Sequence, residues 1–134
     1  MLIAKVPFLS YVTTGKLRLT KHYLGGNLVI NKSLNRHVYA EIRDLCKLYV
    51  KSYINTEFIY NNNYKYRLEI EFIRKTEKYD IDNATIFWAK IFLDTIRPDI
   101  IPNDNVGIIP QLFTKHTITN GDEYILFSLT VVED

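Results

Sequence analysis

The chain has 134 residues, 47% of them hydrophobic and 24% charged, with a net charge of +2; this is the composition of a globular protein and excludes a disordered one. Its length predicts a single domain over residues 1–134, since a chain of this size can bury one core but is short for two. It has no run of about 18 apolar residues to span a membrane, no signal-peptide pattern and no second cysteine to pair with Cys46, so we expect a cytoplasmic protein without disulfides.

Short strands are predicted over the first 30 residues, where the stretches YVTTGKLRLT and LGGNLVI are punctuated by glycines. A helix is predicted from about residue 34 to 53, because apolar residues recur there at helical spacing. Cys46 belongs to this apolar stripe, which indicates a buried thiol rather than a nucleophile. Another face of the same helix carries a basic ridge, made of Arg36, Arg43, Lys47 and Lys51. Such a ridge is either a solvated helix face or a surface that binds nucleic acid.

The second half of the chain predicts a strand, a helix and two more strands. Apolar and polar residues alternate over 64–73, as in a half-buried strand. A helix over 83–96 should end there, because the residue before Pro98 avoids helical geometry. It is apolar on most of its surface, so we expect the sheet on one side and a second protomer on another. Strands over 106–119 and 123–132 are joined by Asn-Gly-Asp and predict a hairpin.

This order of elements predicts a single small α+β domain, with a mixed β-sheet packed against two main helices.

Two aspartates, Asp80 and Asp82, lie one residue apart where the predicted strand gives way to the second helix. In extended backbone alternate residues share a face, so the two carboxylates would converge. Like charges this close favour a cation between them, and oxygen ligands select hard ions such as Mg²⁺. Alternatively, Asp82 caps a helix that starts at Asn83, and Asp80 then has no role. These residues alone leave both interpretations open.

Polar residues continue along the second helix as one narrow stripe, made of Asn83, Lys90, Asp94 and Arg97. Lys90 would pair with Asp94 one turn away, or reach back toward Asp82, because lysine side chains lean toward the helix N-terminus. Asp104 follows in the stretch IPNDNV. It is either a turn residue or a third carboxylate beside the first two.

The combined pattern resembles the RusA family of Holliday-junction resolvases, and its phage and prophage members most closely. The residues that carry the resemblance are DIDN at 80–83, a lysine eight residues after Asp82, an aspartate four further on, and IPNDN at 101–105. The resemblance is tight over 79–106 and looser elsewhere. It implies a homodimeric α+β nuclease of a phage or bacterial host that cuts four-way DNA junctions in recombination and repair, using Mg²⁺ or Mn²⁺.

By position, the resemblance implies that Asp80, Asp82 and Asp104 hold the metal ion. It further implies that Lys90 acts on the scissile phosphate, with Asn83 and Asp94 supporting the site.

Two departures from the family pattern stand out. The first acid of the later pair is Asn103 here, which removes one charge. Founding members carry their catalytic lysine four residues after the second aspartate, where this chain has Ile86. Whether Lys90 takes over that role is therefore open.

Charge is unevenly divided along the chain. Residues 1–78 hold 14 Lys or Arg against 6 Asp or Glu, a balance of +8, whereas residues 79–134 hold 3 against 9, a balance of −6. This division indicates a phosphate-facing surface beside a carboxylate site, although chance clustering on solvated faces also gives it. In the first interpretation the basic ridge binds the DNA backbone together with Arg74, Lys75 and Lys78.

The competing class is a non-catalytic dimeric DNA-binding protein of a mobile element. In that class the aspartates serve only as helix-cap and turn residues.

Overall fold

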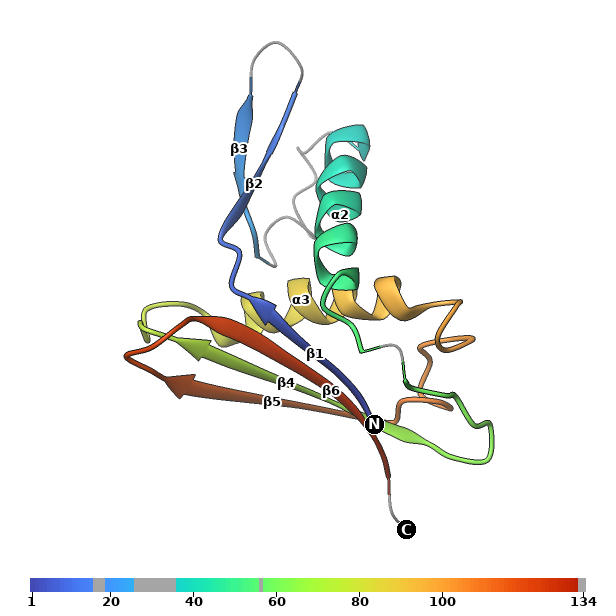
Figure 1. The fold of residues 1–134 in the computed structure, drawn as a ribbon. Helices are drawn as coiled ribbons and strands as arrows, with labels where there is room; N and C mark the ends of the chain where they lie inside the picture. The colour runs from blue at the N-terminus through green and yellow to red at the C-terminus, as the bar shows by residue number, and fades with distance from the viewer. Residues whose placement is uncertain (16–18, 26–35, 56, 133–134) are drawn as a thin grey trace.

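The computed structural model describes residues 1–15, 19–25, 36–55 and 57–132, and confirms an α+β domain with a mixed sheet and two main helices (Figure 1). The elements in chain order are β1 (Leu2–Pro7), β2 (Tyr11–Thr14), β3 (Thr20–Tyr23), α2 (Arg36–Lys51), β4 (Tyr66–Arg74), α3 (Ile81–Ile96), β5 (Gln111–Ile118) and β6 (Tyr124–Val131). The stretch LGGNLVI, predicted as a strand, falls mostly outside the described residues.

Four strands form the main sheet in the order β1-β6-β4-β5, and β2 pairs with β3 in a separate two-stranded ribbon. The pairing of β4 with β5 is parallel, whereas β6 is antiparallel to both β1 and β4. The sheet is therefore mixed, with β5 at one edge. The other edge, β1, is partly covered by a bridge between Ala4 and Ile54.

The predicted hairpin of the last two strands is wrong, because β4 lies between β5 and β6. The connection after β5 crosses the end of β4, where the Thr119 N–H donates to the Arg74 carbonyl at 2.9 Å. The Asn-Gly-Asp turn thus reverses the chain without joining neighbouring strands. Alternating apolar residues and turn residues predict that the chain reverses, but they do not determine which strands pair. Here β6 pairs with β1 and β4 instead of β5.

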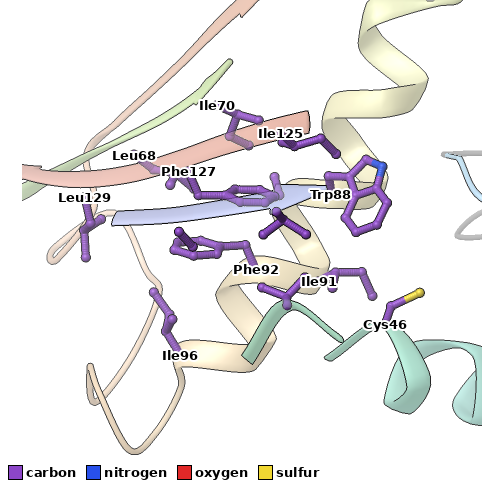
Figure 2. Packing of buried hydrophobic residues seen from close by; sticks show 14 of the residues in the cluster. Cys46, Leu68, Ile70, Trp88, Ile91, Phe92, Ile96, Ile125, Phe127 and Leu129 are labelled. Carbon is purple, nitrogen blue, oxygen red and sulfur yellow. The ribbon is translucent and has the colours of Figure 1, made fainter. Parts of the chain in front are cut away.

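One face of the sheet is covered by α3, and α2 packs against α3 from the side away from the sheet (Figure 1). The rings of Phe92 and Phe127 stack with centroids 4.6 Å apart, and Cys46 of α2 belongs to the same buried cluster as Ile91 (Figure 2). Burial raises the pKa of Cys46 to about 12, as expected for a core thiol. The side of α3 expected to meet a second protomer is therefore largely occupied by α2.

The boundaries of α3 explain how it presents the aspartates. It begins at Ile81, two residues before the predicted start, because the Ala84 N–H already donates to the Asp80 carbonyl at 3.1 Å. It ends at Ile96, as predicted, because Arg97 is extended (φ −98°, ψ 140°) before Pro98. Within the described residues, neither helix is long and apolar enough to cross a lipid bilayer.

Candidate functional site

Asp80 and Asp82 lie together at the N-terminus of α3, and both are exposed. Asp80 occupies the N-cap position of α3, but its side chain makes no capping hydrogen bond. Asp82 lies inside the first turn, so the prediction that it caps a helix starting at Asn83 is wrong. The positive end of the helix dipole stabilises both carboxylates here.

Asn83 ties the two carboxylates to one another. Its backbone N–H donates to Asp82 Oδ1 at 2.9 Å, and its side-chain amide donates to Asp80 Oδ2 at 3.3 Å. Within the described chain, these contacts leave Asp80 Oδ1 and Asp82 Oδ2 without a protein donor. Asn83 thus holds the two carboxylates at one place.

A pocket of about 220 Å³ opens beside this pair. Asp80 and Asn83 form part of its wall, together with the aromatic rings of Phe8, Tyr79 and Trp88. The pocket combines the carboxylate of Asp80 and the amide of Asn83 with a largely apolar lining.

Arg74 lies in the same pocket wall and is already engaged within the chain. Its Nε donates to Glu123 Oε2 at 2.9 Å, and its guanidinium lies 3.6 Å from the centroid of the Phe8 ring. Glu123 also accepts the backbone N–H of Lys75 at 2.9 Å. Arg74 therefore organises the end of β4. The side chains of Lys75 and Lys78, which were predicted to bind DNA together with Arg74, are exposed.

Tyr79 connects the acidic pair to the edge of the sheet. Its hydroxyl shares a hydrogen bond with Nδ1 of His116, which belongs to β5. Burial raises the pKa of Tyr79, so this hydroxyl stays protonated near neutral pH. The N-terminal end of α3 is thereby fixed against the edge strand.

Asp104 lies at the opposite end of α3. Arg97 donates from Nη1 to Asp104 Oδ1 at 3.0 Å, and from Nη2 to Asp94 Oδ1 at 3.2 Å. Lys90 pairs with Asp94 at 3.6 Å, toward the C-terminus of the helix rather than toward Asp82. Lys90, Asp94 and Asp104 therefore belong to one charge network around the end of the helix.

The two acidic groups are far apart within one chain. The 16 residues of α3 span about 24 Å, and Asp80 precedes the first of them while Arg97 follows the last. Among the described residues, no three His, Cys, Asp or Glu side chains gather as a metal-binding group. Asp80 and Asp82 fit Mg²⁺ when water and phosphate complete its shell, but one chain does not bring Asp104 to them.

The predicted basic ridge on α2 is partly exposed. Arg36 is exposed, and Arg43 forms a surface ion pair with Asp44 at 3.3 Å. Lys47 and Lys51 line a groove of about 460 Å³ between α2 and the end of α3. Arg97 and Asp94 line the same groove, so the ridge meets the network that holds Asp104.

Sequence reasoning missed two residues that organise the site. Arg97 was visible as part of the polar stripe, three residues after Asp94, but its contact with Asp104 depends on the loop that follows. No local sequence pattern indicated the contact of Glu123 with Arg74, because the two residues are 49 positions apart in sequence.

In comparisons with known proteins, no protein-family model, curated protein or solved structure matches this chain.

Proposed function

We propose that the protein is a metal-dependent endodeoxyribonuclease of the RusA type, which resolves four-way DNA junctions by symmetric paired nicks. The observation that supports this most directly is the pair Asp80 and Asp82, held by Asn83 at the N-terminus of α3. The likeness of residues 79–106 to that family supports it as well. Its setting would be the cytoplasm of a bacterial host, in recombination or repair of phage or host DNA.

A purely structural role does not account for the pair. A capping aspartate accepts a backbone N–H from the second or third residue of the helix, and the Asp80 carboxylate accepts only the side-chain amide of Asn83. Asp82 accepts only the N–H of the next residue. Both carboxylates therefore keep an oxygen directed to other chemistry, which favours an enzyme over a binding protein with capped helices.

A site that uses Asp104 as well needs two copies of the chain. If a second copy lies along the β5 edge with its α3 antiparallel to the first, its Asp104 approaches the Asp80 end of the first copy. The edge can accept such a copy, because α3 and β5 expose apolar side chains there. These side chains are Ile81, Ile86, Leu112, Phe113 and Ile118. A two-fold dimer would then hold two sites, one for each strand to be nicked.

Asp80, Asp82 and the other copy's Asp104 would hold Mg²⁺. The bound ion supplies an activated water and shields the charge that develops on the phosphate. Lys90 suits a phosphate contact, since its side chain is 45% exposed and its ion pair with Asp94 is long at 3.6 Å. Asn83 orients both carboxylates of its own chain.

The decisive experiment is cleavage of a labelled synthetic four-way junction beside linear duplexes of the same arms, with Mg²⁺ and with EDTA. We expect paired nicks in the junction only, and none with EDTA or with Asp82→Asn. Asp82→Asn should still bind the junction, because removing a carboxylate near phosphate does not weaken an electrostatic contact. Binding without nicks under Mg²⁺ or Mn²⁺ would instead support the non-catalytic class.

A mixed dimer tests whether two copies share the site. Asp82→Asn and Asp104→Asn are each expected to be inactive alone. In a mixed dimer, a shared arrangement places both substitutions in one site and leaves the other intact, so single nicks should return. If each chain holds a complete site, both sites stay damaged and no activity returns.

A further inference from the structure

The β2–β3 ribbon has one buried and one exposed face. Cα partners are Tyr11 with Tyr23, Val12 with His22, Thr13 with Lys21 and Thr14 with Thr20. Alternate residues of a strand share a face. The ribbon stands away from the four-stranded sheet and runs beside α2 (Figure 1). Gly15, with φ 106°, adopts at the end of β2 a left-handed conformation that other residues strain to reach.

The face that carries Val12, Thr14 and His22 belongs to the interior. Thr14 is buried, its hydroxyl is 2.8 Å from His22 Nε2, and Val12 packs against the core. Contacts between β2 and α2 fix the ribbon in place. The opposite face is left to solvent.

The exposed face is aromatic and basic. Lys21 Nζ lies 4.0 Å from the centroid of the Tyr11 ring and 5.3 Å from that of Tyr23. The two rings are 6.0 Å apart, and Tyr23 is 67% exposed. A cation held between two accessible rings presents a charge for phosphate and flat surfaces for bases at one place.

The charge of this part of the chain identifies the class of partner. Residues 1–40 contain six Lys or Arg and no Asp or Glu. An acid-free basic segment is complementary to a polyanion. The exposed rings add stacking, which paired bases inside a duplex do not offer but unpaired bases do.

We infer that the outer face of the β2–β3 ribbon binds unpaired or unstacked bases of DNA, with Tyr23 and Tyr11 stacking and Lys21 contacting the backbone. This inference deepens the proposed function, because it names the part of the chain that distinguishes a branch point from continuous duplex. None of these three residues belongs to the acidic site or to the predicted DNA-binding ridge.

The test is binding measured by fluorescence anisotropy in EDTA, so that cleavage plays no part. The probes are a labelled oligothymidylate, a four-way junction and a linear duplex. Tyr23→Ala should weaken binding of the oligothymidylate and the junction by about 10-fold or more and the duplex by much less. Tyr23→Phe should bind like the wild type, because it keeps the ring.

Lys21→Ala should weaken binding to all three DNAs. It should also reduce the slope of log affinity against log salt by about 0.7 to 0.9, the loss of one phosphate contact.

Matched controls are Tyr64→Ala, an exposed tyrosine outside the ribbon, and Lys65→Ala, an exposed lysine just before β4. Both should bind like the wild type. The inference is overturned if Tyr23→Ala and Lys21→Ala bind like the wild type, or if the controls lose as much. It is also overturned if Tyr23→Ala weakens duplex binding equally.

The two proposals fail separately in these experiments. A wild type that binds branched DNA through the ribbon but never nicks it contradicts the proposed function alone. A wild type that nicks junctions, with ribbon variants that bind as tightly, contradicts the ribbon inference alone.

Discussion

Arg97 holds Asp104 at 3.0 Å and so ties the loop that follows α3 to the end of that helix. If Asp104 contributes to the metal site, Arg97 is a positioning residue for it. Arg97→Ala should lower junction cleavage by about 10- to 100-fold, the effect of a misplaced group, and raise the Mg²⁺ concentration for half-maximal cleavage. Junction binding and stability should change little, since exposed ion pairs contribute about 1 kcal/mol or less.

Arg97→Lys should recover part of the Mg²⁺ response. The matched control is Lys65→Ala, which removes an exposed cation outside the proposed site and the proposed dimer edge. A normal Mg²⁺ response in Arg97→Ala would show that Asp104 needs no such support.

The stacked pair of Phe92 and Phe127 predicts a large loss of stability on truncation. Phe92→Ala should lower the free energy of unfolding by about 3–5 kcal/mol, because both the buried ring and its packing are lost. Urea unfolding followed by circular dichroism measures the change. Leu48→Ala on the exposed side of α2 should stay within about 0.5 kcal/mol of the wild type; similar losses in both variants would argue against this core.

Glu123 should make the stability of the folded protein depend on pH. The backbone N–H of Lys75, followed by the side chain of Arg74, lowers the pKa of Glu123 in the folded chain. Ionised Glu123 therefore stabilises the fold above its ordinary pKa, and this contribution is lost as the pH falls through the lower folded value. Glu123→Gln should be less stable than the wild type at neutral pH, and the difference should shrink below about pH 4.5.

Urea unfolding across this pH range tests the prediction. Glu57→Gln, which changes an exposed carboxylate, should stay within about 0.5 kcal/mol of the wild type. A constant difference between Glu123→Gln and the wild type at every pH would mean that Glu123 acts through packing instead of charge.

Cys46 should not react with thiol reagents in the folded protein. It is buried, and its pKa of about 12 leaves almost no thiolate at neutral pH. Ellman's reagent should therefore label no thiol in the native state and one per chain in guanidinium chloride. Rapid labelling of native protein would place α2 differently from the packing in Figure 2.

Local sequence patterns predicted the helices and strands better than they predicted which of these elements pair or pack together. The strand around Leu68 and Ile70 and the end of α3 before Pro98 follow from alternation and backbone sterics, which act over a few residues. The hairpin prediction failed because strand order depends on contacts between distant segments. The burial of α3 by α2 was missed for the same reason, since an apolar helix surface does not specify what covers it.

The same difference between local and long-range contacts applies to the candidate site. Asp80, Asp82 and Asn83 are close in sequence and stay together at one helix end. Lys90 had two geometrically allowed directions, and the pairing with Asp94 is the one observed. Asp104 follows a loop whose path no local rule determines, so its position beside Arg97 was not predictable.

Trp88 is the only tryptophan of the chain, is 2% exposed, and lines the pocket beside Asp80. Its fluorescence is therefore an intrinsic optical probe that needs no label. Unfolding should shift its emission to longer wavelength as water reaches the indole. Occupation of the pocket should instead change the intensity at a nearly constant wavelength, so one spectrum can separate a change at the site from a loss of the fold.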